Sequence, residues 1–132
     1  MPKLTRQGLI RKNWQLCREI VKLIRGENCE LCGTEGREVD HCFSRGNKEA
    51  FYLISNLSLL CSECHSHKTY RRYGFDLKVY EHVIEREGLE EFKRIRAISE
   101  KKGGFPDWQY MVYHEQQNLK LKEQRALIMA AA

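Results

Sequence analysis

The sequence lacks any long apolar run and contains only two prolines among its 132 residues. A helix that crosses a bilayer needs about 20 apolar residues in succession, so we expect no membrane partner. The first residues, MPKLTRQGLIRKN, also lack the apolar stretch of a signal peptide. With 42% apolar and 31% charged residues, the composition is typical of a globular protein and excludes wholesale disorder. Together these features predict a folded, cytoplasmic protein.

Acidic residues are few in the first part of the chain, which carries the whole of the net charge of +5. Residues 1–75 contain 13 Lys and Arg against 8 Asp and Glu, while residues 76–132 contain 10 of each kind. A polyanion such as nucleic acid is attracted to such a region. A solvated basic face without a partner explains so mild an excess equally well. Charge therefore supports a nucleic-acid partner without establishing one.

The chain length fits one domain, which we divide into an N-terminal helix in 1–27, a core in 28–75 and C-terminal helices in 76–132. Apolar residues at steps of four and three predict a first helix that Gly26 ends. These residues are Ile10, Trp14, Cys17, Val21 and Ile24. In the core, REVDH and NLSLLC are typical of short strands, and a helix follows near Glu63. The predicted fold class is α+β and mainly helical.

Two helices are predicted after the core, and a break at KKGGFPD separates them from a last one. Asp76 is a good N-cap for the first of them. The apolar positions are Leu77, Tyr80 and Ile84 in the first helix and Leu89, Phe92, Ile95 and Ile98 in the second. We expect Asp107 to cap the last helix, which reaches into the 120s. Its apolar stripe is weak, so it docks loosely, frays, or pairs with a partner protein or a second copy of the chain.

Two C-x-x-C motifs, CELC at 29–32 and CSEC at 61–64, are separated by 28 residues. Two such turns complete the four-sulfur shell that zinc prefers. The predicted ligands of this structural zinc are Cys29, Cys32, Cys61 and Cys64. A disulfide or a thioredoxin-like pair is the alternative, but a cytoplasmic location disfavours the first and the absence of a βαβ pattern disfavours the second. A closed shell cannot activate water, so any catalysis comes from other residues.

Four further polar residues accompany these motifs, namely Asp40, His41, Asn56 and His65. The segment CELCGTEGREVDHCFSRGNKEAFYLISNLSLLCSECHSHKT, residues 29–69, resembles the ββα-metal core of the HNH endonuclease family, in its variant with a four-cysteine zinc. The matching pattern is C-x-x-C, V-D-H, S-R-G, N-L and L-C-x-x-C-H-x-x-K-T, in that order. The resemblance covers under a third of the chain and leaves the flanking helices out.

The resemblance implies metal-dependent hydrolysis of phosphodiester bonds in DNA. His41 would be the general base that takes a proton from water, a task that suits an imidazole near neutral pH. Asp40 and His65 would hold one catalytic divalent metal, which is Mg²⁺, Mn²⁺, Ni²⁺ or Zn²⁺. Asn56 would support the loop that carries His41 and orient its ring through a hydrogen bond. Because neighbouring strand residues point to opposite sides, Asp40 and His41 can act from different directions.

Other metal-type residues have simpler interpretations. Some relatives have a further metal histidine four residues after the position of His65, where this chain has Thr69. His67 is offset around the helix, and we expect it to face solvent or a phosphate rather than the metal. Cys17 and Cys42 have no C-x-x-C partner, and we expect both to be packed thiols.

Cations and aromatic rings alternate in KTYRRYGF, residues 68–75, which continues directly from the metal helix. Cations there can neutralise phosphates and tyrosine rings can stack on bases. The alternative is that Tyr70 and Tyr73 anchor the next helix. The predicted nucleic-acid contacts are Arg45, Lys48, Lys68, Arg71 and Arg72. Candidates to extend them at the N-terminus are Lys3, Arg6, Arg11 and Lys12.

The function that we expect is therefore an HNH-type endonuclease with DNA as its partner, a structural zinc and no small-molecule cofactor. A non-catalytic, zinc-dependent nucleic-acid binding module on the same scaffold is the rival. A third possibility is a subunit of a phage packaging or recombination complex, in the cytoplasm of a bacterial or phage-infected cell. Asp40, His41 and His65 together favour the enzyme, and the weak stripe of the last helix keeps the third possibility open.

Overall fold

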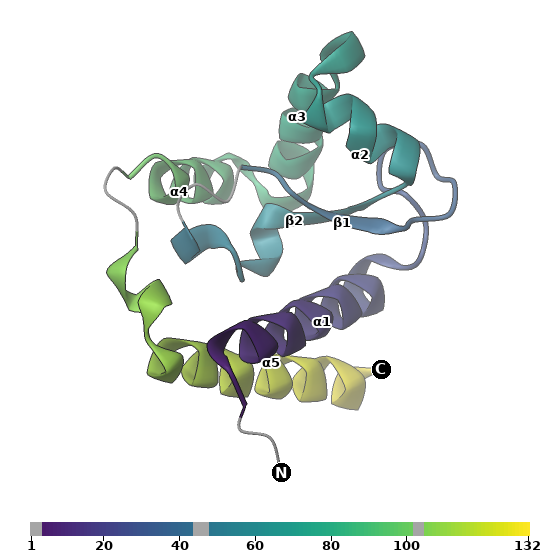
Figure 1. Cartoon of the computed structure of the whole chain (residues 1–132). Helices are drawn as coiled ribbons and strands as arrows, with labels where there is room; N and C mark the ends of the chain where they lie inside the picture. The colour runs from purple at the N-terminus through teal and green to yellow at the C-terminus, as the bar shows by residue number, and fades with distance from the viewer. Residues whose placement is uncertain (1–3, 44–47, 102–104) are drawn as a thin grey trace.

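The computed structural model describes residues 4–43, 48–101 and 105–132. A small sheet lies at its centre, with helices on both sides (Figure 1). Strand β1 (Glu38–His41) pairs antiparallel with strand β2 (Leu57–Leu60). The described residues form five α-helices besides this sheet. The fold is therefore α+β and mainly helical, as the sequence predicts.

Helix α1 (Arg6–Arg25) covers one side of the sheet (Figure 1). It begins after Thr5, whose side chain accepts a hydrogen bond from the Gly8 N–H at 3.0 Å, and it ends at Gly26, which has φ of 80°. The predicted helix is confirmed, but the predicted stripe is wrong at Ile24, which is 46% exposed. The buried face is wider than one stripe because α1 packs against both the sheet and the last helix. Its buried residues are Leu9, Asn13, Leu16, Cys17, Ile20 and Val21.

The last helix, α5 (Met111–Ala131), lies beside α1 and runs in the same direction (Figure 1). Near its start, Asn13 donates a hydrogen bond to the His114 carbonyl at 3.0 Å. Near its end, Arg125 donates to Glu19 at 2.6 Å. The helix thus docks on α1 along its length and extends beyond the predicted 120s.

Helices α2 (Ser62–Thr69), α3 (Phe75–Glu87) and α4 (Leu89–Ser99) lie on the opposite side of the sheet from α1 (Figure 1). Helix α2 follows β2 almost directly and begins within one residue of the predicted position. Gly88, with φ of 92°, separates α3 from α4. The buried residues of α3 and α4 are Val79, Val83, Phe92 and Ile95, whereas Leu77 and Leu89 are exposed.

Two predicted helix caps are wrong. Asp76 lies inside the first turn of α3, and the N-cap residue of that helix is Gly74. Asp107 lies in the short 3-10 turn Pro106–Gln109, and Tyr110 precedes α5. In both places another turn comes directly before the helix, so the local preference of an aspartate for an N-cap does not decide where the helix begins.

The two strands separate two apolar cores. The α1-side core consists of Leu16, Cys17, Ile20, Val21, Val39, Phe51, Tyr52, Leu57, Leu59 and Leu121. The cysteine-side core consists of Cys29, Cys42, Phe43, Leu60, Cys64, Val79, Val83, Phe92 and Ile95. Because side chains alternate along a strand, His41 faces α1 while its neighbour Asp40 faces α2. No helix in the described ranges combines the length and the apolar character that crossing a membrane requires.

Candidate functional site

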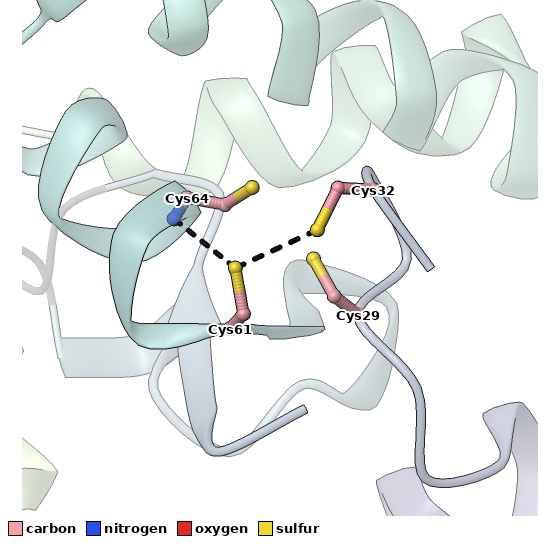
Figure 2. Close-up of side chains that lie close together, drawn as sticks. All are labelled: Cys29, Cys32, Cys61 and Cys64. Atoms are coloured by element: carbon pink, nitrogen blue, oxygen red, sulfur yellow. Dashed lines mark hydrogen bonds between the residues drawn. The ribbon is translucent and has the colours of Figure 1, made fainter. Parts of the chain in front are cut away.

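Four cysteines from two distant segments converge beside the start of α2 (Figure 2). The Sγ atoms of Cys29, Cys32, Cys61 and Cys64 all lie within 4.8 Å of one another. Four thiolates that bind zinc at about 2.3 Å lie about 3.8 Å apart, and the Sγ atoms of Cys32 and Cys61 are 3.6 Å apart. The predicted ligand set is thus brought together, and its geometry is compatible with a structural zinc.

Local hydrogen bonds fix each C-x-x-C turn. In the first turn, the Gly33 N–H donates to the Cys29 carbonyl at 3.0 Å, and Gly33 adopts φ of 81°. In the second turn, the Sγ of Cys61 accepts a hydrogen bond from the Cys64 N–H at 3.3 Å and so caps α2. The backbone therefore directs all four thiols toward one point.

The chemistry of the thiols also favours a metal. Burial, together with the neighbouring thiols, raises the pKa of Cys64, so this group does not ionise by itself. A hydrogen bond with the Thr34 hydroxyl instead lowers the pKa of Cys32 to about 6. Four thiolates repel one another at this distance, and a divalent ion offsets that repulsion. The donor set is therefore compatible with zinc in its chemistry as well as in its spacing.

Glu30, a buried carboxylate that the sequence did not reveal as functional, connects the cysteine cluster to α3. It lies between the two cysteines of the first motif and accepts hydrogen bonds from His82 at 2.8 Å and Arg86 at 2.7 Å. It also accepts one from the Leu59 N–H at 2.5 Å and lies 3.9 Å from Arg25. Burial acts to raise the pKa of Glu30, but these bonds and charges together outweigh it and lower the pKa. Its partners on α3 lie 52 and 56 residues away in the chain, so no local pattern indicates them.

Asp40 and His65 form a second candidate metal site. The Nδ1 atom of His65 lies 3.1 Å from Oδ1 of Asp40, whose side chain is 4% exposed. The two atoms are hydrogen-bonded to each other. Adjacent ligands of an octahedral ion with bonds of about 2.1 Å lie about 3.0 Å apart, so the same spacing is compatible with two neighbouring ligands. Burial raises the pKa of Asp40, and the charges of Lys68 and His65 oppose this effect. A cation at this carboxylate favours its ionised form.

Lys68 lies closer to this site than the sequence indicated. Its Nζ lies 3.3 Å and 3.1 Å from the two oxygens of Asp40 and donates to the His41 carbonyl at 2.5 Å. The contact with the second oxygen lacks hydrogen-bond geometry, and that buried oxygen accepts no hydrogen bond from the described residues. The ammonium group is thus a partner of the candidate metal ligand, and its contact with a phosphate stays a prediction.

The ring of His41 has a defined tautomer and orientation. Its Nε2 atom lies 3.0 Å from the carbonyl oxygen of Phe51. A carbonyl only accepts hydrogen bonds, so Nε2 carries the proton and Nδ1 carries the lone pair of the neutral ring. The Trp14 ring stacks on the imidazole at 5.0 Å with an interplanar angle of 16°, and the Phe51 ring lies 4.7 Å away. The imidazole is therefore held in a form that can accept a proton.

Asn56 is fully buried. Its side-chain oxygen accepts a hydrogen bond from the Phe43 N–H at 3.0 Å, and its amide donates to the Ala50 carbonyl at 3.2 Å. Its own carbonyl accepts from the Cys42 N–H at 2.7 Å. These bonds support the chain that follows His41, whereas the expected bond to the His41 ring stays a prediction.

A cleft of about 1040 Å³ brings the candidate catalytic residues together. Asp40, His41 and His65 all line it, and its walls come from α1, β1, α2 and α3. Among the predicted nucleic-acid contacts, Lys68 and Arg71 line the same cleft, and so does Arg11, one of the N-terminal candidates. The site is therefore a recess that can receive a phosphodiester, with both candidate metal ligands and the candidate base at its surface.

The remaining predicted nucleic-acid contacts are not among the described residues that line this cleft. Arg45 and Lys3 lie outside the described residues, and the described backbone resumes at Lys48. The guanidinium of Arg72 lies over the Tyr70 ring at 5.0 Å. Tyr70 and Tyr73 are 67% and 77% exposed, so the alternative in which both rings anchor the next helix is wrong. Their stacking on bases stays a prediction.

Three other residues near the site pack into the protein. His67 was expected to face solvent or a phosphate, but its side chain is only 17% exposed, and its ring lies 4.9 Å from that of Phe75 and 5.1 Å from that of Tyr73. The expected solvent-facing orientation is wrong because Tyr73 and Phe75, after α2, pack against the ring, whereas a contact with phosphate stays a prediction. Cys17 and Cys42 are buried as predicted, and burial raises the pKa of each thiol to about 12.

Comparison with known proteins agrees with the resemblance in the motifs. Residues 29–71 match the family model described as HNH endonuclease. No curated protein and no solved structure matches the chain. The matched segment contains both cysteine pairs and all four candidate catalytic residues, and it leaves α1 and the helices after residue 71 outside. The HNH resemblance of this segment is confirmed, and it indicates a nuclease-type function related to nucleic acid.

Proposed function

We propose that the protein is a metal-dependent HNH endonuclease that hydrolyses phosphodiester bonds in DNA. One observation carries the proposal. Asp40, His41 and His65 line the same cleft, and His41 is held in the tautomer that can accept a proton at Nδ1. The family match at residues 29–71 supports the reaction class. None of the six cysteines forms a disulfide, which agrees with action in the reducing cytoplasm of a bacterial or phage-infected cell.

His41 is the general base in this proposal. Its Nδ1 takes a proton from a water molecule, whose oxygen attacks the phosphorus atom while the bond to the 3′ oxygen breaks. The Phe51 carbonyl and the Trp14 ring hold the imidazole in place while its charge changes. Asn56 supports the chain after His41 through its bond to the Phe43 N–H.

Asp40 and His65 are the proposed ligands of the catalytic ion. A carboxylate and an imidazole suit Mg²⁺, Mn²⁺, Ni²⁺ or Zn²⁺. When bound, such an ion supplies positive charge that offsets the charge developing on the phosphate and on the leaving 3′ oxygen. Lys68 lines the same cleft, so we place its ammonium group beside the bound phosphate.

Supercoiled plasmid, incubated with zinc-loaded protein and added Mg²⁺, Mn²⁺ or Ni²⁺, tests the proposal. Wild type nicks or linearises the plasmid. His41→Ala loses the base, so its rate falls by about 10²-fold to 10⁴-fold while its zinc and helix content are unchanged. His67→Gln is the matched control, because His67 does not line the cleft, and this variant retains cleavage. Equal rates for wild type and His41→Ala contradict the assigned base.

The same experiment separates the rival functions. A wild-type protein that binds DNA but cuts it with none of the metals is a zinc-dependent binding module. A protein that neither binds nor cuts DNA fits the subunit of a packaging or recombination complex, which acts through a partner protein. The juxtaposition of Asp40 and His65 at 3.1 Å favours the enzyme over both.

A further inference from the structure

We propose that α1, which lies outside the family match, forms the second wall of the substrate cleft and binds the DNA backbone through Arg11 and Arg18. This inference rests on the proposed function and adds to it a site for phosphates beyond the scissile one. The α1 residues that line the cleft are Ile10, Arg11, Trp14, Gln15 and Arg18. Their spacing places them along one side of the helix.

The position of α1 is fixed relative to the candidate base. Trp14 stacks on the His41 ring at 5.0 Å. Arg11 precedes Trp14 by three residues and Arg18 follows it by four, so each arginine lies about one helical turn, or about 5 Å, along the axis from the stack. The two arginines therefore lie on either side of the stack along the helix, and both line the cleft, so they can contact phosphates on either side of the proposed cleavage site.

Some charged residues of α1 make contacts that hold the helix in the fold, and others line the cleft. The helix contains six basic residues and a single acidic one, Glu19, and Glu19 binds Arg125 of α5 at 2.6 Å. Arg6 donates to the Gln109 carbonyl at 3.1 Å, and Arg25 is paired with Glu30 and Glu87. These residues hold α1 in the fold and are not part of the wall.

The cleft side of α1 carries only positive charge. Arg11 and Arg18 are exposed and form no ion pair with the described residues. The three carboxylates that line the cleft, on Glu38, Asp40 and Asp76, come from β1 and α3. One wall therefore carries the candidate metal ligand, whereas the α1 wall has the charge that a phosphodiester backbone requires.

Binding measured without cleavage tests the inference. The full zinc-loaded chain carrying His41→Ala is titrated into fluorescent duplex and single-stranded DNA over a series of salt concentrations, with no added divalent metal. We expect Arg11→Gln/Arg18→Gln to weaken binding at low salt on the order of tenfold, because two phosphate contacts are lost. The slope of log affinity against log salt should fall in magnitude by about 2.

The matched control is Lys120→Gln/Lys122→Gln, which removes the same charge from exposed positions on α5, a helix that contributes no residue to the cleft. It should leave the salt slope nearly unchanged. Equal losses in the two double variants, or no loss in the arginine variant, overturn the inference, provided that circular dichroism and zinc content match the parent. Cleavage by protein with intact His41 is scored separately. If the wild-type protein cuts no DNA but the two arginines still contribute to binding, the proposed catalysis is overturned and the inference about α1 stands.

Discussion

The two cores on either side of the sheet are stabilised in different ways. The cysteine-side core contains the thiols of Cys29 and Cys64 and borders a cluster of buried charges around Glu30. The α1-side core contains mostly aliphatic and aromatic side chains. The segment that carries the proposed metal ligands thus combines a cysteine cluster that is compatible with a structural zinc with paired charges, whereas the layer that carries Trp14 and Arg11 depends on ordinary packing.

Neutral hydrogen bonds link α1 to α5 beside the α1-side core. The Nε2–H of His114 donates to the Trp108 carbonyl at 2.7 Å, so its Nδ1 accepts a hydrogen bond from the Tyr52 hydroxyl at 3.1 Å. Asn13 donates to the His114 carbonyl, and its side-chain oxygen accepts from Asn118 at 2.9 Å. Burial lowers the pKa of His114, which favours the neutral ring. This region buries polar groups without burying charge.

Loss of a proposed zinc ligand should give the largest difference in stability between the two cores. Cys64→Ser removes one of the four proposed zinc ligands, and zinc bound at a four-cysteine site contributes on the order of 10 kcal/mol to folding. We expect this variant to lose zinc and to unfold on the cysteine side, which zinc analysis, circular dichroism and limited proteolysis measure. Cys42→Ala is the matched control, because it removes a buried thiol that is not a ligand and should keep zinc. A metal-free protein with the wild-type melting temperature contradicts this prediction.

Glu30→Gln should have the next largest effect. It keeps the shape of the side chain but removes a buried carboxylate that pairs with Arg25 and Arg86, and breaking a buried ion pair costs about 3 to 5 kcal/mol. Both arginines keep Glu87 as a partner, so we expect the lower end of this range. Urea denaturation measures the loss in the free energy of unfolding. Glu35→Gln is the control, because its pair with Arg37 is exposed and should contribute less than about 1 kcal/mol.

The pH dependence of the free energy of unfolding provides a second test of the role of Glu30. The folded pKa of Glu30 lies below its ordinary value of 4.5. Its stabilising effect is therefore complete above about pH 4.5 and is lost as the pH falls through the lower folded pKa. Glu30→Gln should remove this part of the acid dependence. If wild type and variant lose stability in parallel below pH 4.5, other groups control the acid limit.

His114→Phe should have the smallest effect of the three. An aromatic ring still fills the site, but the Tyr52 hydroxyl and the Trp108 carbonyl lose their hydrogen bonds to the imidazole nitrogens, at a cost of about 1 to 3 kcal/mol. Because the folded pKa of His114 is below 6.5, its contribution is complete above about pH 6.5 and declines as the pH falls through the lower folded value. Denaturation at several pH values checks both effects, with Lys122→Ala, at an exposed position of α5, as the control. A larger loss in His114→Phe than in Glu30→Gln reverses the ranking of the two cores.

Short-range rules explain which parts of the site the sequence predicted. The spacing of each C-x-x-C motif depends on one tight turn, and the opposite directions of Asp40 and His41 depend on strand alternation, so both are readable from neighbouring residues. Glu30 has the same local surroundings as any exposed glutamate in a turn. Its role is set by Arg86 and His82, whose positions depend on how α3 packs.

The first helix shows the same limit. Its bounds follow from Thr5 and Gly26, and the sequence predicted its C-terminal end. Its buried face does not follow from one apolar stripe, because two different elements pack against it. Asn13 carried a usable signal, since it lies four residues after Leu9 and three before Leu16 on the buried side. The stack of Trp14 on His41 carried none, because it depends on where α1 meets β1.

The alternation of side chains along β1 has a consequence for how the protein can change over time. Contacts from α2 hold the Asp40 side chain, and contacts from α1 hold the His41 ring. Distant substitutions on the α2 side can therefore adjust the proposed metal ligand, while those on the α1 side adjust the ring of the proposed base. A slip of the pairing by a single residue would instead exchange the two directions and abolish both roles at once.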